Sequence, residues 1–381
     1  MSAVYLDYNA TAPIRPEAAE AVACALRIGG NPSSVHATGR TARAAVELAR
    51  VQVAALVGAP DEAVTFTSGG TEANALAIES AFATGVRKPL IGLAEHASVM
   101  ENALASRNWV EGWPVTADGA ADLDWLADRL KRWRIEDGPV FAAMSLANNE
   151  TGVIQPVAEA AALVHDAGGR LHVDATQAAG KIAVDIAALD ADTLALSAHK
   201  LGGPQGVGAL VSGPGAVLSR RLHGGGQERG RRAGTENVAG IAGFGAAASA
   251  AERDLPHFAD QAAWRDAAQL RLEQGAAVTV FGAKAGRLAS VLCFASRGLD
   301  AERQVMALDL DGVMVSAGAA CSSGKVTPSH VITAMGFTAL AGQAIRVSGG
   351  WATTEDDWRR FADAWLAIHN RISARHRVTA A

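Results

Sequence analysis

LSAHKLGGP, at residues 196–204, joins an apolar, strand-like run (Thr193–Leu196) to a glycine-rich turn. Lysine is usually a surface residue, yet Lys200 stands at the end of this predicted strand beside serine, histidine and glycine. A lysine amine in a partly desolvated site can form a Schiff base with a carbonyl cofactor, above all pyridoxal phosphate. The alternative is an exposed lysine before a loop. Whether Lys200 binds a cofactor depends on whether other parts of the chain supply the remaining residues of such a site.

Strand-like and helical patterns alternate along the first two-thirds of the chain. The predicted helices include Thr71–Ala83 and Val157–Ala167, and the predicted strands are Ala63–Thr67, Pro89–Leu93, Val140–Leu146, Arg170–Val173, Thr193–Leu196 and Val207–Val211. This alternation predicts an α/β fold with a mostly parallel central sheet flanked by helices. Ligands bind beyond the carboxyl ends of the strands in such sheets, so we look for the site there.

The pattern changes near residue 246, where a long helical stretch begins. It is followed by the strand-like runs Val278–Phe281, Ala289–Phe294 and Ala344–Ser348, by a helix at Ala301–Leu308, and by a last helix. That last helix is expected to start near Thr353, where threonines precede acidic residues as in a capping box. We therefore expect a large domain over residues 15–245 and a smaller C-terminal α/β domain made of residues 1–14 and 246–381.

Composition narrows the class of protein. The 381 residues are 49% hydrophobic and carry a net charge of −5, which argues against a nucleic-acid-binding protein. No basic segment followed by an apolar run opens the chain, and no apolar stretch is long enough to span a membrane, so we expect a cytoplasmic protein. Three widely spaced cysteines argue against a disulfide framework or a closed zinc site. Cys24 and Cys293 lie in patterns typical of a core, whereas Cys321 lies among small residues in a loop.

SGGTE, at residues 68–72, follows a predicted strand and opens a helix. Two glycines let the backbone approach a ligand closely, and the N–H groups of a helix start suit a phosphate. The alternative is a simple strand-to-helix turn. The spacing of the glycines does not fit a dinucleotide-binding fingerprint.

Further polar residues follow other predicted strands. Asp174 could pair with a pyridinium nitrogen and Gln177 with the ring hydroxyl edge, although an aspartate there also caps helices. His96 could stack on a flat ring or move a proton, and Asn149 could donate to a ring oxygen; both also occur without any ligand. Arg346 lies within an apolar strand, where a substrate carboxylate or an internal ion pair would be its partner.

Taken together, these motifs resemble the cysteine desulfurases of the NifS/IscS type, which are fold-type I pyridoxal phosphate enzymes related to class-V aminotransferases. The matching segments, in order, are LDYNAT (6–11), GNPSS (30–34), SGGTE (68–72), NNETG (148–152), HVDATQ (172–177), SAHKLGGP (197–204), HGGGQERG (223–230), RAGT (232–235), ACSSG (320–324) and IRVS (345–348). They extend over nearly the whole chain. Two departures are mild: Ala319 stands where the family often has serine, and Gly70 where many members have alanine.

The resemblance implies a role for each matching position. Lys200 would bind pyridoxal 5'-phosphate covalently, Cys321 would be the nucleophile that takes sulfur, and His96 would assist catalysis. The expected cofactor contacts are Gly70, Thr71, His96, Asn149, Asp174, Gln177, Ser197, His199 and Lys200, with Thr235 supplied by the other subunit of a homodimer. Asn31 and Arg346 would bind the substrate carboxylate.

The resemblance also implies the reaction, in which L-cysteine yields L-alanine and a Cys321 persulfide. The sulfur would pass to an acceptor or an iron–sulfur scaffold protein, with Cys321 as a transient cluster ligand shared with that scaffold. The long segment at residues 324–330 resembles members that serve such scaffolds, and its start is closer to the nitrogen-fixation branch. A selenocysteine lyase, an aminotransferase of the same fold and a non-catalytic sulfur-transfer scaffold remain as alternatives.

Overall fold

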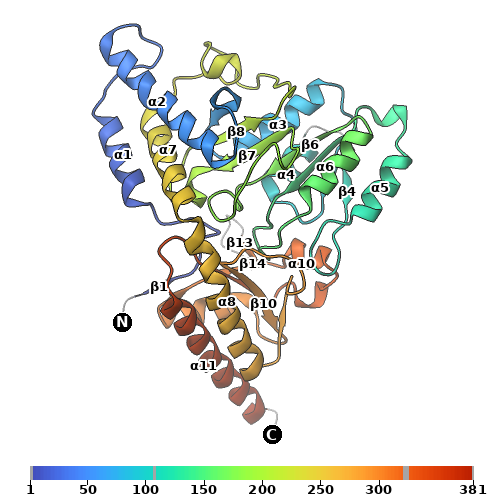
Figure 1. The fold of residues 1–381 in the computed structure, drawn as a ribbon. Coiled ribbons are helices and arrows are strands. Elements are labelled where there is room, and N and C mark those ends of the chain that lie inside the picture. The colour runs from blue at the N-terminus through green and yellow to red at the C-terminus, as the bar shows by residue number, and fades with distance from the viewer. Residues whose placement is uncertain (1–2, 106–108, 321–325, 380–381) are drawn as a thin grey trace.

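The computed structural model describes residues 3–105, 109–320 and 326–379, and these form two layered units, one above the other in Figure 1. The upper unit contains a seven-stranded sheet flanked by helices. The lower unit contains a four-stranded antiparallel sheet with long helices beside it. The predicted nucleophile, Cys321, lies outside the described residues.

The larger sheet has the strand order β2-β8-β7-β6-β5-β3-β4. Its strands are β2 (Val64–Thr67), β3 (Leu90–Gly92), β4 (Glu111–Trp113), β5 (Phe141–Ser145), β6 (Arg170–Asp174), β7 (Thr193–Ser197) and β8 (Gly208–Ser212). Only β8 runs antiparallel to its neighbours, so the prediction of a mostly parallel sheet is confirmed. The sequence did not predict β4, because three residues containing glutamate and glycine carry little strand signal.

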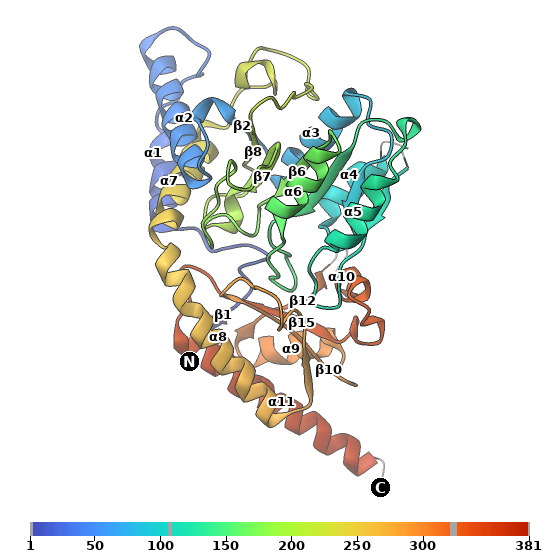
Figure 2. The same ribbon diagram turned by 45° about the vertical axis from the view of Figure 1, so that its right-hand side comes forward.

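Helices pack around this sheet (Figures 1 and 2). They are α1 (Pro16–Leu26), α2 (Ala37–Leu56), α3 (Gly70–Ala83), α4 (Ala97–Ala105), α5 (Leu123–Lys131), α6 (Val157–Asp166) and α7 (Val238–Arg253). α3 starts three residues after β2 and buries mostly small side chains, which lets it lie close to the sheet. α1 buries Ala18 and Ala25, and Cys24 is exposed. The expectation that Cys24 is a core residue is therefore wrong, since it lies off the buried face of its helix.

The smaller unit contains a sheet of order β12-β15-β10-β9. Its strands and helices are β9 (Val278–Val280), β10 (Val291–Ser296), β12 (Ser316–Ala317), β15 (Ala344–Ser348), α8 (Leu255–Gly275), α9 (Ala301–Leu310), α10 (His330–Ala334) and α11 (Glu355–Thr379). The short strand pairs β1 (Val4–Tyr5) with β11 (Val313–Met314) and β13 (Ala319–Ala320) with β14 (Val326–Thr327) complete the strands. Thr354 and Asp357 form reciprocal side chain-to-backbone hydrogen bonds at the start of α11, as the capping box predicted.

The extreme N-terminus belongs with this smaller unit. β1 pairs with β11, and Asp7 forms a bridge with Ser348 at the end of β15. The sequence predicted a domain boundary between residues 245 and 246. Both residues lie inside α7, whose Ala247 and Ala251 are part of the core of the larger unit. We therefore propose that the domain boundary lies at Asp254, between α7 and α8. No helix among the described residues is long and apolar enough to cross a membrane.

An ion-pair cluster supports the amino-terminal edge of the larger sheet. His165 Nε2 lies 2.9 Å from Asp192 Oδ2 and Nδ1 lies 3.0 Å from Asp190 Oδ2. Burial lowers the pKa of His165, but the hydrogen bonds and charges of Asp192 and Asp190 outweigh burial and raise it. The folded-state pKa is thus above the unfolded value, so this stabilisation is complete below about pH 6.5 and is lost as pH rises through the folded-state pKa.

Replacing His165 with glutamine is therefore expected to lower the free energy of unfolding more at pH 5.5 than at pH 8.5. Because the side chains are partly exposed and solvent screens them, we expect a difference of about 0.5 kcal/mol. Urea unfolding of both proteins at the two pH values measures it. An equal loss at both values would show that the charge of His165 contributes nothing.

Candidate active site

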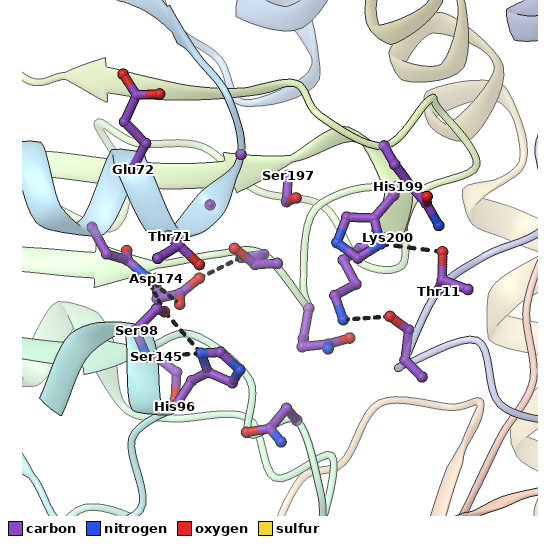
Figure 3. Close-up of a pocket in the computed structure, with 18 of the residues that line it drawn as sticks. Thr11, Thr71, Glu72, His96, Ser98, Ser145, Asp174, Ser197, His199 and Lys200 are labelled. Atoms are coloured by element: carbon purple, nitrogen blue, oxygen red, sulfur yellow. Dashed lines mark hydrogen bonds between the residues drawn. The ribbon is translucent and has the colours of Figure 1, made fainter. Parts of the chain in front are cut away.

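A cavity of about 490 Å³ lies at the carboxyl ends of β5, β6 and β7, beside the start of α3 (Figure 3). The ends of these strands lie side by side: Ser145, the last residue of β5, pairs with Asp174, the last residue of β6, which in turn pairs with Ala195 in β7. Nine of the predicted cofactor residues line this cavity, namely Gly70, Thr71, His96, Asn149, Asp174, Gln177, Ser197, His199 and Lys200. Segments up to 130 residues apart in the sequence thus meet at one edge of the sheet.

Lys200 ends a short 3-10 turn (Ala198–Lys200) that follows β7 directly. Its Nζ donates to the carbonyl oxygens of Asn9, at 2.6 Å, and Ala10, at 2.8 Å. Burial, followed by the charge of Arg346, lowers the pKa of Lys200 to about 8. At pH 7.5 about a quarter of such amines are neutral, against about one in a thousand for an ordinary lysine. The amine is therefore well prepared to attack a carbonyl group.

One end of the cavity is suited to a phosphate. Thr71 and Ser197 face this space, and the first N–H groups of α3 have no acceptor within the helix (Figure 3). Thr176 Oγ1 is buried here and has no hydrogen-bond partner among the described residues. A Cβ added to Gly70 would lie 3.0 Å from that hydroxyl, so the missing methyl group leaves space beside it. The N–H of Ser68 is not available, because the carboxylate of Glu72 accepts it at 2.7 Å.

His199 lines the same cavity and lies beside Lys200 (Figure 3). Burial and the nearby charge of Lys200 lower the pKa of His199 to about 4, so its imidazole is neutral at pH 7. Its Nδ1 lies 3.2 Å from the hydroxyl oxygen of Thr11. A neutral imidazole held in this way can donate or accept one hydrogen bond without adding a charge.

Asp174 and His96 also line the cavity, and one buried amide connects them. Asn74 Nδ2 donates to Asp174 Oδ2 at 2.9 Å and to Ser98 Oγ at 2.8 Å. Ser98 in turn contacts His96 Nδ1 at 2.8 Å. Asn74 Oδ1 lies 2.9 Å from His172 Nε2, and burial lowers the pKa of His172 to about 4, so His172 is the donor. One asparagine therefore sets the orientation of both groups.

Asn74 is 0% exposed, so we expect the substitution Asn74→Leu to affect both stability and the site. It would remove one hydrogen bond each from Asp174, Ser98 and His172, and we expect it to reduce the free energy of unfolding by about 2 kcal/mol. We also expect about 10-fold weaker binding of pyridoxal phosphate, because two of its proposed contacts lose their support. Urea unfolding and fluorescence titration measure the two effects.

Gln304→Leu is the matched control for Asn74→Leu. Gln304 is also 0% exposed and fully hydrogen-bonded, but it lies on α9 in the smaller unit. It should lose stability and keep its affinity for the cofactor. Equal losses of affinity in the two variants would mean that Asn74 acts only through stability.

Gln177 and Asn149 line the cavity but are also held by other groups. Gln177 Nε2 donates to Asn9 O at 2.9 Å, and its Oε1 accepts from Lys181. The carbonyl of Asn149 accepts from Asn9 Nδ2 at 3.0 Å and from Arg346 Nη1 at 3.2 Å. Hydrogen bonds to residues outside the cavity lining thus hold both residues in place, and both line the cavity.

Among the residues that the structure describes, three predicted ones do not line the cavity. Arg346 pairs with Asp7 through Nη2 at 2.7 Å, which is the internal ion pair considered from the sequence, while its Nε is buried and has no partner in the described part of the chain. Asn31 lies between α1 and α2, where its Oδ1 accepts from the N–H of Ser33. Thr235 is exposed in the segment that leads to α7.

Several residues that line or support the site were not assigned from the sequence, among them Asn9, Asn74, Thr176 and Lys181. Asn9 and Thr176 lie in motifs that were noted, but neither was given a role. Asn74 and Lys181 interrupt alanine-rich segments with a polar side chain. Such an interruption was the available signal, although the sequence does not show that these side chains are buried.

Comparison with known proteins relates the whole chain to one group. The family model described as Aminotransferase class-V matches residues 4–361. A curated protein named cysteine desulfurase from Cereibacter sphaeroides is 42% identical over 98% of this chain and 97% of its own. The crystal structure of a NifS-like protein from Rickettsia africae superposes with a TM-score of 0.88 at 30% identity, covering 97% of this chain and 99% of that one. A structure described as SspA in complex with cysteine has a TM-score of 0.77 at 26% identity, covering 91% and 98%.

Proposed function

Because this chain belongs to the cysteine desulfurases of the class-V aminotransferase family, we propose that it removes sulfur from L-cysteine in the cavity around Lys200. The observation that carries the proposal is the half-buried amine of Lys200, with a lowered pKa, in a cavity that Asp174 and His96 also line. The match extends over nearly the full length of the chain, and the fold is that of the NifS-like enzymes.

The enzymes of this family use pyridoxal phosphate, and the cavity fits that cofactor. Lys200 would hold its aldehyde carbon, and Asp174 its ring nitrogen. Gly70, Thr71, Ser197 and His199 would hold its phosphate together with Thr176, whose buried hydroxyl has no other partner. Gln177 and Asn149 would contact the oxygen side of the ring and His96 its face. When bound, the cofactor supplies an electron sink for the carbon skeleton of the substrate.

The residues of the chain would then divide the reaction between them. Lys200 moves a proton from and back to the substrate carbon, a task that suits an amine whose pKa is near the working pH. The thiolate of Cys321 attacks the substrate sulfur, so that an S–S bond forms and the C–S bond breaks. The electron pair of that C–S bond stays with the carbon, which takes up a proton and leaves as L-alanine. Cys321 retains the sulfur as a persulfide.

Arg346 and Asn31 are the proposed partners of the substrate carboxylate. The unpartnered Nε of Arg346 supports this role, and Asp7 orients the guanidinium from the other side. A related protein has been solved with cysteine bound, which supports an amino acid of that size as substrate. Neither Arg346 nor Asn31 lines the cavity, so both roles require a movement or a second subunit.

We propose that the protein is a cytoplasmic homodimer. Thr235 is exposed, as a residue that contributes to the partner subunit's cofactor site would be. The persulfide of Cys321 would pass to an acceptor or an iron–sulfur scaffold protein, with Cys321 as a transient shared cluster ligand. We also propose that the sulfur is used in the assembly of nitrogenase clusters.

The direct test supplies L-cysteine to the purified protein with a thiol reductant and measures sulfide and alanine. We expect equal amounts of the two products, because one C–S bond is broken for each alanine released. Adding candidate scaffold proteins should increase the rate. Pyruvate and ammonia in place of alanine, or alanine without sulfide, would contradict the proposal.

A further inference from the structure

Lys181 is a buried lysine that the proposed mechanism does not use. It is 5% exposed and lies in the turn after the motif that contains Asp174 and Gln177. Its Nζ donates to Asn9 Oδ1 at 2.7 Å and to Gln177 Oε1 at 2.9 Å. No salt bridge to Lys181 is found in residues 3–105, 109–320 and 326–379. A buried amine with only amide partners is costly to maintain, and burial lowers its pKa, so its position calls for an explanation.

Asn9 connects Lys181 to the reactive amine. Its side-chain oxygen accepts from Lys181, and its backbone carbonyl accepts from Lys200 Nζ at 2.6 Å and from Gln177 Nε2 at 2.9 Å. Its Nδ2 donates to Asn149 O, and its N–H donates to Ser348 Oγ at 3.0 Å. Every polar group of Asn9 is therefore engaged, and each bond leads to a residue at or next to the cavity.

Backbone hydrogen bonds also restrain the segment that holds Lys200: the N–H groups of Ala10 and Thr11 donate to Asp7 O, and the N–H of Ala12 donates to His199 O. Residues 8–10 form a turn between β1 and α1, outside any helix or strand. The carbonyls of Asn9 and Ala10 are the acceptors for Lys200 Nζ, so the position of the amine depends on the position of this turn. The Asn9 side chain anchors the turn to the larger unit by accepting from Lys181, while Ser348 anchors it to the smaller one.

We propose that Lys181 is a positioning residue: by holding the side chain of Asn9, it places the Asn9 and Ala10 carbonyls that orient Lys200 Nζ. The proposal rests on the proposed role of Lys200 and adds a residue behind it. Lys181 does not touch the cofactor cavity, so it acts only through Asn9 and Gln177.

The test is a double-mutant cycle on the full chain with Lys181→Met and Asn9→Ala. Methionine keeps the length of the side chain and removes the donor. The first measurement is the rate at which cofactor-free protein forms its covalent linkage to pyridoxal phosphate, followed by absorbance and by borohydride trapping at Lys200. The second is kcat and KM for L-cysteine. Each single variant should slow linkage formation and lower kcat by about 10-fold with KM nearly unchanged, because the amine is displaced rather than removed.

If Lys181 acts through Asn9, the double variant should be no slower than the slower single variant. The inference would be overturned if the effects of the two single substitutions multiply in the double variant. It would also be overturned if the Lys181→Met protein forms the linkage at the wild-type rate. Gln304→Met provides a buried polar control that should lose stability without a change in linkage rate, which separates positioning from a general loss of packing. Lys200→Ala is measured in parallel. If this variant still forms the linkage, the proposed function is wrong. If it does not, and the effects of Lys181→Met and Asn9→Ala multiply in the double variant, only the role of Lys181 is rejected.

Discussion

Lys200→Ala is expected to abolish the covalent linkage to pyridoxal phosphate and to lower cysteine desulfurization by at least about 10³-fold. Lys200 is proposed both to bind the cofactor and to transfer the substrate proton, and a transferred proton alone contributes about 10²- to 10⁴-fold. Burial and the nearby charge of Arg346 make this amine unusually reactive at neutral pH. The measurement is sulfide release from L-cysteine, together with mass spectrometry after borohydride reduction.

The surface variant Lys131→Ala is the matched control for Lys200→Ala. Lys131 is 74% exposed and pairs only with Asp128, so the linkage and the activity should both be unchanged. A linkage that forms on another lysine in the Lys200→Ala protein, with activity retained, would place the cofactor elsewhere. Lys181 is the first position to inspect in that case, because it is a buried lysine that donates to Gln177, a residue of the cavity lining.

Cys321→Ser is expected to lower sulfide and alanine production from L-cysteine by at least about 100-fold while cofactor binding remains intact. A serine hydroxyl cannot form a persulfide, so the sulfur has no acceptor within the protein. The same result would separate a desulfurase from an aminotransferase or a selenocysteine lyase, which need no such thiol. Sulfide release is assayed beside the absorbance of the bound cofactor.

The other two cysteines supply the control for Cys321→Ser. Cys24 is exposed on α1, so Cys24→Ser tests whether any accessible thiol suffices, and it should leave activity unchanged. Cys293 is fully buried, and burial raises the pKa of its thiol, so it is a poor nucleophile. If sulfide release survives in Cys321→Ser and disappears in Cys24→Ser, the proposed nucleophile is wrong.

Motifs at strand ends were predictable because they are local. Ser68–Glu72, Asp174 and Lys200 each follow an apolar run, and parallel strands must end at the same edge of a sheet. The same reasoning could not find Asn74 or Lys181, because both are polar residues in alanine-rich segments. Their roles come from burial against partners far away in sequence, such as His172 for Asn74 and Asn9 for Lys181.

The sequence also left the state of individual side chains open. Arg346 had two possible partners, and only the folded chain shows that Asp7 occupies one side of it while Nε stays unpaired. The reactivity of Lys200 likewise depends on desolvation and on Arg346, which is contributed by the other sheet.

By itself, the sequence determined the mostly parallel sheet, the family and the residues that surround Lys200, since these follow from hydrophobic periodicity and from motifs that are contiguous in the chain. Only the tertiary structure decided how those residues are held: the Asn9 turn that orients Lys200, the Asn74 amide that joins Asp174 to His96, and the lowered pKa of the amine. Hydrogen bonds and desolvation depend on distances between segments that lie far apart in the chain, and no local pattern encodes those distances.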